Sequence, residues 1–346
     1  MSDWRQTANR IGPIAVYLWW ILSGPAWMVQ AEEKNALFVA FAMTKEQESS
    51  PLPTDSGIFL RSSVDADWQR IGPVIQQMAS FTTDPNNLNT LFIACGNGIV
   101  RSTDGGATWR MTTGWRESDV NKVVVDPENG RNVYASSVWG ISASYDGGET
   151  WQTANRGLKK RFSRSIMVDS QNPKRLLVGT EDGIYESRDR ARTWRPVRSS
   201  PKVVILRMDR SQADPGLWIA GTEGKGVYLS RNDGRRWEPV APDLKEANIY
   251  GVSIDPFNTD HLATGGWGVG VWISSDLGET WRRTESKLPS PNVMAMTFDA
   301  NVNGRLWVST FEEGTYYTDD GGKTWQDGDL YGAYVWDLGF VKMDEK

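Results

Sequence analysis

An eight-residue phrase recurs along the chain and limits the folds open to it more than any other feature. Its first clear copy reads Ser102-Thr-Asp-Gly-Gly-Ala-Thr-Trp109, and close copies end at Trp151, Trp281 and Trp325, the last with Thr318 in the place of Ser. An internal repeat at a nearly fixed period indicates an architecture in which one small structural unit is stacked many times.

Three further copies are degenerate but remain in register. The copy at 187–194 lacks the Gly, the copy at 230–237 has lost the Asp and the Thr, and the copy at 63–68 is two residues shorter. The tryptophans that end the copies follow one another at intervals of 41 to 44 residues, and they are Trp68, Trp109, Trp151, Trp194, Trp237, Trp281 and Trp325. The chain therefore contains seven units of nearly equal length.

Each copy has the chemistry of a hairpin turn followed by an apolar anchor. The Ser and Asp side chains can hydrogen-bond the backbone of a tight turn, the Gly permits a positive φ, and the Trp begins the next strand. Between copies, the runs 121–127, 132–136 and 140–144 predict three strands before the turn, and one follows it. Seven such units predict an all-β fold, a seven-bladed β-propeller of four-stranded blades.

The two ends of the chain predict how the ring closes. The segment 334–341 has the pattern of a first strand, whereas 35–42 has the pattern of a second strand. We therefore expect the C-terminal strand to pair into the first blade, which removes the open edges of the ring.

The repeated phrase resembles the Asp-box, or BNR repeat, over essentially all of the chain after residue 31. The resemblance implies a scaffolding role for the box residues, namely Asp104, Trp109, Asp146, Trp151, Asp189, Trp194, Asp276, Trp281, Asp320 and Trp325. The boxes and the Asp-Pro turns then share one face of the propeller. Loops from second to third strands, and from blade to blade, share the opposite face, where ligands are expected.

Composition excludes several classes of function. With 38 basic and 43 acidic residues the net charge is −5, which argues against a nucleic-acid coat. The single cysteine, Cys95, and the single histidine, His261, cannot form a disulfide within the chain or a structural zinc site. The sequence predicts no metal site and no cofactor.

The N-terminal segment predicts export. Residues 11–22 are uncharged, Ser23-Gly-Pro25 interrupts any helix, and Ala31 stands where a signal peptidase could cut. We expect residues 1–31 to be a signal peptide and 32–346 to be one propeller in the periplasm or outside the cell. The alternative is that residues 11–30 remain as a membrane anchor.

Basic residues form one candidate binding patch on the face opposite the boxes, namely Lys159, Lys160, Arg161, Arg164, Arg198 and Lys202. Such a patch could receive an acidic protein tail, an anionic glycan or a lipid headgroup, or could simply be a solvated loop. The aromatic residues Trp115, Trp139 and Trp267 are candidate anchors on the same face. The long loop at 43–56 is either a binding lid or an excursion without function.

Two classes of function remain open. Asp-box propellers include sialidases and other glycoside hydrolases, and Asp119, Asp182, Glu223, Glu312 and Glu313 could supply carboxylates. However, the nearest match to the Phe-Arg-Ile-Pro motif of sialidases, at 69–73, departs from it. The xyloglucanase-like enzymes pair two propellers, and this chain has length for one.

The chain is more similar to single-propeller BNR proteins, including the photosystem II stability and assembly factors. That resemblance implies a non-enzymatic, exported docking scaffold or assembly factor that binds a protein partner, such as a subunit of a membrane complex, in part through an Arg-rich patch. Peripheral membrane association would be compatible with it. A glycoside hydrolase or glycan-binding propeller is the alternative. Sortilin-type propellers share the box but are larger.

Overall fold

The computed structural model describes residues 34–346 except for 43–55, 76, 116, 285–287 and 344–346. The predicted signal segment and nearly all of the predicted long loop at 43–56 lie outside the described residues. Within the described part of the chain, no helix has the length and apolar character needed to cross a membrane.

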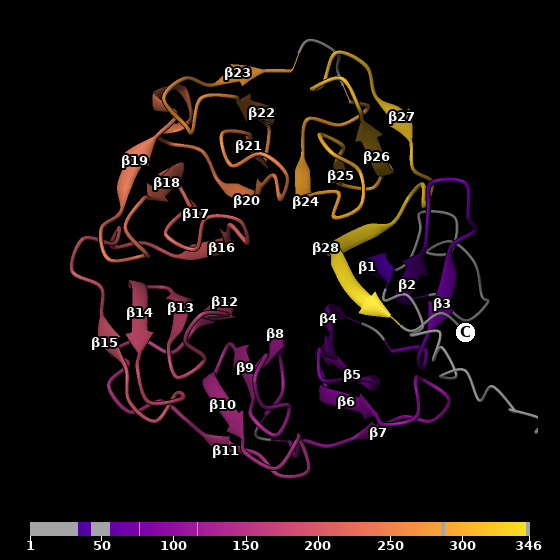
Figure 1. Cartoon of the computed structure of the whole chain (residues 1–346), viewed down its shortest axis with the longest axis vertical. Helices are drawn as coiled ribbons and strands as arrows, with labels where there is room; N and C mark the ends of the chain where they lie inside the picture. Colours follow the sequence, from indigo (N-terminus) through magenta and orange to yellow (C-terminus); the bar gives the residue numbers. More distant parts are fainter. Residues whose placement is uncertain (1–33, 43–55, 76, 116, 285–287, 344–346) are drawn as a thin grey trace, which may run out of the picture. The chain divides into compact units, whose positions relative to one another are not determined.

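Seven four-stranded antiparallel sheets are arranged in a ring (Figure 1), and the innermost strand of each sheet lines a central channel. The innermost strands are β28 (Tyr334–Met343), β4 (Met78–Asp84), β8 (Val120–Val125), β12 (Ser163–Val168), β16 (Ile205–Arg210), β20 (Ile249–Ile254) and β24 (Val293–Phe298). The second strands are β1 (Lys34–Ala42), β5 (Asn87–Cys95), β9 (Val133–Ser137), β13 (Leu176–Thr180), β17 (Trp218–Thr222), β21 (Leu262–Gly266) and β25 (Leu306–Thr310).

The remaining strands lie farther from the channel. The third strands are β2 (Gly57–Arg61), β6 (Gly98–Ser102), β10 (Gly140–Ser144), β14 (Gly183–Ser187), β18 (Val227–Ser230), β22 (Gly270–Ser274) and β26 (Gly314–Thr318). The outer strands are β3 (Gln69–Ile71), β7 (Arg110–Met111), β11 (Gln152–Thr153), β15 (Arg195–Pro196), β19 (Glu238–Val240), β23 (Arg282–Arg283) and β27 (Gln326–Asp327). A 3-10 turn, η1 (Pro242–Leu244), is the one helical element in the described residues. The predicted seven-bladed β-propeller is confirmed.

The ring closes as the sequence predicts. β28 pairs with β1, with Val39 opposite Leu338 and Ala36 opposite Val341, so the first blade has the order β28-β1-β2-β3. Burial of Leu338 and Val341 adds an apolar contribution to the closing hydrogen bonds.

The hydrophobic core lies between neighbouring blades rather than at the centre of the ring. In one cluster, Phe92 and Ile99 from the second blade pack against Val123 and Val133 from the third. All five residues of β9 are buried, whereas both residues of the outer strand β11 are exposed. Each blade is thus stabilised mainly by its two neighbours, and the boxes hold the outer hairpin of each blade.

Hydrogen bonds within the box explain the repeated phrase. In the first clear copy, Asp104 accepts bonds from the Ser102 hydroxyl at 2.7 Å and from the Thr108 amide at 2.8 Å, and the Gly106 amide donates to Ser102 Oγ at 2.9 Å. The Trp109 indole donates to the Gly106 carbonyl. The hydroxyl and amide of Thr108 and the hydroxyl of Ser102 lower the pKa of Asp104 to about 2.

Degenerate boxes keep this geometry with other residues. Asn232 accepts from the Arg236 amide at 2.8 Å, in the place of the missing Asp. Ala191 adopts a φ of 63° where the close copies have Gly. In the shortened copy, the Arg61 side chain holds the turn by donating hydrogen bonds to the carbonyls of Val64 and Ala66, both at 2.6 Å.

Replacing Gly148 by Ala should destabilise the fold more than replacing Gly147. Both residues have positive φ, but a Cβ on Gly148 would lie 2.7 Å from Phe92 Cε1, whereas the nearest atom to one on Gly147 is at 3.8 Å. Left-handed strain alone costs about 1 kcal/mol, and overpacking adds about 1 to 3 kcal/mol. Urea unfolding of the two variants measures the difference, and equal losses would contradict this account of the box.

Stability should fall between pH 3.8 and about 2, because Asp104, Asp146 and Asp276 each have a folded pKa of about 2 against an ordinary value of 3.8. A lowered folded pKa stabilises the protein above the ordinary value, and this contribution is lost as pH falls through the folded value. A variant with Asn at all three positions should show a smaller fall in unfolding free energy over this range. Asn keeps a side-chain oxygen that can accept a hydrogen bond from the backbone amide, as Asn232 does from Arg236.

Candidate functional site

One irregularity recurs at the start of every innermost strand and builds the channel mouth. In each blade the register between the first and second strands shifts around a single residue, which is left without a pairing partner. These seven bulged residues are Ala79, Asn121, Arg164, Leu206, Tyr250, Met294 and Trp336. Because a bulge re-aims a side chain away from the sheet, each blade contributes one side chain to the mouth.

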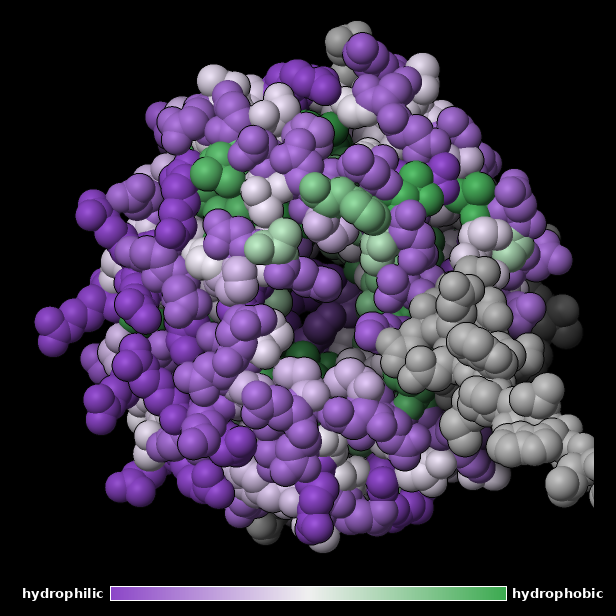
Figure 2. All heavy atoms as spheres, viewed as in Figure 1, coloured by the Kyte–Doolittle hydropathy of each residue, from purple (hydrophilic) through white to green (hydrophobic). Residues whose placement is uncertain are grey.

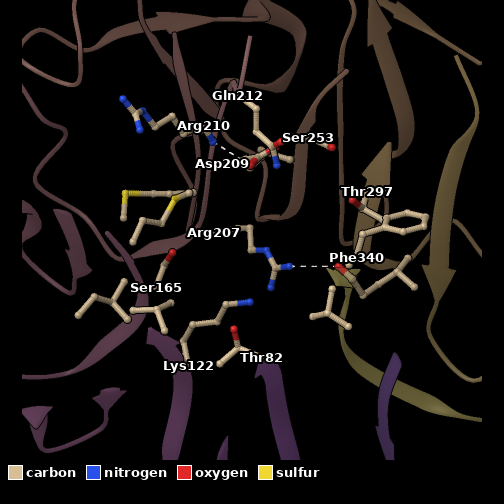
Figure 3. Close-up of a pocket in the computed structure, with 18 of the residues that line it drawn as sticks. Thr82, Lys122, Ser165, Arg207, Asp209, Arg210, Gln212, Ser253, Thr297 and Phe340 are labelled. Carbon is tan, nitrogen blue, oxygen red and sulfur yellow. Dashed lines mark hydrogen bonds between the residues drawn. The ribbon is translucent and has the colours of Figure 1, made fainter. Parts of the chain in front are cut away.

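A cavity of about 260 Å³ occupies this mouth, and all seven bulged residues line it. Gln77, Asp119 and Arg207 add polar groups to its wall. A second cavity, of about 450 Å³, lies in the channel and is lined by Lys122, Arg207 and other residues of the innermost strands (Figure 3). On the face drawn in Figure 2, hydrophilic residues predominate around a central hollow.

Arg164 is the charged member of the bulge ring. Its side chain lines both cavities and is half-buried. Burial lowers the pKa of its guanidinium. Among the described residues, no carboxylate forms an ion pair with Arg164. An anionic group of a ligand would therefore find a cation already in place.

A cluster of three charged residues joins blades across the channel. Asp337 on β28 is fully buried and pairs with Lys122 on β8 at 2.7 Å and with Arg207 on β16. Arg207 also donates to the Leu338 carbonyl at 3.4 Å (Figure 3). Burial alone would raise the pKa of Asp337, but the two cations lower it. The closing strand is thus tied to two other blades through one carboxylate.

Asp209 is a second carboxylate in the channel, and its environment is different. Burial raises its pKa, and its carboxylate accepts bonds from the backbone amides of Ile254 and Arg210 at 2.9 and 2.8 Å. It therefore links neighbouring innermost strands.

An aromatic strip borders the channel mouth over three adjacent blades. Phe311 stacks edge to face against Trp267, with ring centroids 5.2 Å apart, and against Tyr334, at 5.1 Å. The Tyr334 hydroxyl donates to Glu312. Trp336, two residues farther along, is 44% exposed at the mouth. These rings offer a preformed apolar surface at little entropic cost.

The structure separates the predicted basic residues into two groups. Lys159, Lys160 and Arg161 are exposed in the loop from β11 to β12, and Arg198 and Lys202 are exposed in the loop from β15 to β16. We call these five residues the loop cations. Arg164 does not join them, because it belongs to β12 and its bulge directs it into the channel.

The predicted aromatic anchors all lie in exposed loops. Trp115 precedes β8 and is 83% exposed, whereas Trp139 joins β9 to β10 and donates its indole N–H to Ser118. Trp267 joins β21 to β22 and is the one of the three that belongs to the aromatic strip.

The sequence reasoning did not single out Lys122, Arg207, Trp336 and Asp337 as site residues. The repeat itself contains a signal for three of them. When the seven innermost strands are aligned, Lys122, Arg207 and Asp337 occupy the position directly after the bulge, and the other four blades have Ser, Gly or Ala there.

The candidate catalytic carboxylates are dispersed. Asp119 is the one carboxylate in the wall of the mouth cavity, counting the described residues. Asp182 accepts from the Tyr185 hydroxyl at 3.1 Å, and Glu312 from Tyr334. Cys95 is buried, which raises the pKa of its thiol. The described residues contain no group of three or more His, Cys, Asp or Glu side chains placed to hold a metal ion.

A comparison with models of protein families assigns the chain to a family. The Sortilin-Vps10 model, described as sortilin, neurotensin receptor 3, matches residues 139–249 and 225–336, which together are more than half of the chain. The chain belongs to the Sortilin-Vps10 family. A comparison with curated proteins gives no match.

Solved structures with a similar fold resemble this Sortilin-Vps10 family member at low identity. The GH74 enzyme of Niastella koreensis has a TM-score of 0.66 and 20% identity, with 80% of this chain and 51% of that chain covered. YCF48 from Cyanidioschyzon merolae has a TM-score of 0.62 and 17% identity, with coverage of 78% and 90%. YCF48 bound to D1 peptide has a TM-score of 0.55 and 18% identity, with coverage of 72% and 81%.

Coverage differs between these two groups. The chain spans about half the length of the GH74 enzyme, but it matches nearly all of YCF48. At these identities the likeness shows the fold, and function has to be argued from the site.

Replacing Asp337 by Asn should lower the free energy of unfolding by about 3 to 5 kcal/mol, because two channel cations would lose their buried counter-ion. Asp319→Asn is the matched control. It breaks the surface pair with Arg305, in which Asp319 is 42% exposed, and should cost less than about 1 kcal/mol. Urea unfolding measures both, and equal losses would rule out a special role for the channel cluster.

Proposed function

We propose that this protein is an exported, non-enzymatic propeller that docks a segment of a protein partner over its channel mouth. It would act as a scaffold or assembly factor for a membrane-associated complex. The observation that carries this proposal is the ring of seven bulged residues, which gives one concave site with a cation and several apolar side chains.

The chemistry of the mouth suits a polypeptide segment. Arg164 supplies an available charge for an acidic side chain or a carboxylate. Gln77 supplies an amide group for backbone hydrogen bonds, and Asn121 supplies its Oδ1, because its Nδ2 already donates to the Ser163 carbonyl. Met294 and Trp336 supply apolar surface in the same wall. Polar groups that orient a ligand, placed beside apolar surface in one cavity, are typical of a recognition site.

The aromatic strip extends this site beyond the cavity. Aromatic side chains are enriched among the residues that dominate binding energies, and Trp267, Phe311 and Tyr334 are already stacked against one another. A partner segment that leaves the mouth across these rings would bury apolar surface without first ordering them.

The structural comparisons support peptide binding. One similar structure is YCF48 bound to D1 peptide, and this chain covers 81% of it. That protein therefore holds a peptide. The export proposed here rests on the N-terminal segment, through its uncharged run at 11–22 and the small residue Ala31.

Glycoside hydrolysis is the alternative, because GH74 enzymes share the fold. Hydrolysis of this kind generally uses two carboxyl groups placed across the bond. In the described residues, Asp119 is the carboxylate of the mouth cavity, and Asp209 is that of the deeper cavity. The mouth also holds two arginines rather than the three that clamp a sialic acid. This arrangement favours binding over hydrolysis.

Affinity purification of the C-terminally tagged full chain from solubilised membranes of its host tests the proposal. The mouth variant combines Arg164→Gln with Trp336→Ala. Its control combines Arg188→Gln with Phe257→Ala, which removes an exposed Arg and an exposed aromatic ring on the box face. The mouth variant should recover at least about 10-fold less of the partner, the usual effect of removing two central contacts.

A synthetic peptide from the recovered partner should then bind the purified wild-type and control proteins but not the mouth variant. Equal recovery by all three proteins would place the docking site elsewhere. Release of reducing sugar from glycans by the wild type, abolished by Asp119→Asn, would replace the docking proposal with the enzymatic one.

A further inference from the structure

Charge is distributed very unevenly along the chain. Residues 156–236, which contain β12 to β18, hold 19 of the 38 basic residues but nine of the 43 acidic residues. That segment carries a formal charge of +10, and the remainder of the chain carries −15. Because these blades are adjacent in the ring, the charge separation along the sequence is also a separation in space (Figure 1).

The loop cations lie on both sides of the blade β12–β15. Ser200, between Arg198 and Lys202, accepts a bond from the Ile184 amide at 3.1 Å, and the Lys159 backbone lies beside Tyr185. Both loops therefore border the start of β14 and flank one end of the same blade.

The loop cations are available for a ligand. All five are exposed, and within the described part of the chain none forms an ion pair. Glu181 and Asp182 lie between the two loops, in the turn from β13 to β14, and Asp182 is engaged by the Tyr185 hydroxyl. Five cations against two carboxylates leave an excess of positive charge on this end of the blade.

This part of the surface has no apolar anchor. The exposed large hydrophobic residues of the described chain are Val74, Met111, Trp115, Trp139, Phe257, Trp267, Val302, Tyr331 and Trp336, and none of them falls in 156–236. Protein interfaces concentrate aromatic anchors at their centre, and single-stranded nucleic acids require aromatic rings for base stacking. A layer of phosphate headgroups requires only exposed cations on flexible side chains.

We propose that the loop cations bind a membrane surface rich in anionic phospholipid. The negative charge on the rest of the molecule is repelled by the same surface, so the protein is held with the blade β12–β15 toward the bilayer. The aromatic strip lies on other blades and takes no part in this contact. This inference is independent of the proposed docking function, because it concerns different residues and a different ligand.

Vesicle co-sedimentation of the purified full chain tests the proposal. The probes are vesicles of phosphatidylcholine alone and vesicles in which one third of the lipid is phosphatidylglycerol. Because the apolar run at 11–22 can bind lipid of any charge, the readout is the ratio of the two partition coefficients. The patch variant has Gln at Lys159, Lys160, Arg161, Arg198 and Lys202.

A control variant makes the same change in composition and net charge elsewhere. It has Gln at Lys174, Lys323, Lys342, Arg131 and Arg283, all of which are exposed. We expect the ratio to fall at least about 100-fold in the patch variant, because each cation near an anionic leaflet contributes roughly a five-fold factor. The control should stay within about threefold of the wild type, since charges farther than a screening length contribute little.

Three results would overturn the proposal. The first is a wild-type ratio near one, and the second is an equal loss in both variants. The third is displacement of the wild-type protein from anionic vesicles by duplex DNA at equal phosphate concentration, together with loss of DNA binding in the patch variant. That result would make the patch a nucleic-acid site. Correct folding of both variants is checked by their urea midpoints.

Discussion

Pairing of β28 with β1 closes the ring of blades. The core lies between blades, so each blade is stable only when both of its neighbours are present, and an open ring would leave two blades half covered. Closure by the last strand removes that weakness. Asp337 strengthens it, because this buried carboxylate on β28 binds Lys122 and Arg207 from two other blades. The final strand is therefore fixed along its length by hydrogen bonds and across the channel by charge.

The same regularity that builds the scaffold also creates the site. Every innermost strand begins with a bulge, and every bulge sends one side chain into the channel mouth. The scaffold sets the seven positions, and the sequence is free to vary the residue at each. Here the choice of Arg164, Asn121, Tyr250, Met294 and Trp336 gives a mouth that is polar on one side and apolar on the other. The boxes, which keep their hydrogen bonds even where Asn232 or Ala191 departs from the phrase, leave this face unconstrained.

Much of the fold could be predicted because its signals are local. The Ser102 and Asp104 pair bonds the backbone of its own turn, and a contact that spans few residues is visible as a short motif. The site could be predicted only in part. The sequence groups Arg164 with Lys159 to Arg161 because they are neighbours along the chain. The bulge at Arg164 turns its side chain into the channel, whereas the other three stay in solvent. The strip of Trp267, Phe311 and Tyr334 combines residues from three blades, so no single segment reveals it.

By itself, the sequence determined the repeat, the number of blades, the closing strand and the face that carries the boxes. Each of these follows from period, turn chemistry or strand pattern, which act over distances of a few residues. Which charged side chains come into contact became visible in the folded protein alone. Lys122, Arg207 and Asp337 are far apart in sequence, but the innermost strands bring them within hydrogen-bonding distance across a narrow channel. Electrostatic interaction depends on separation in space and on burial, and neither quantity exists until the ring has closed.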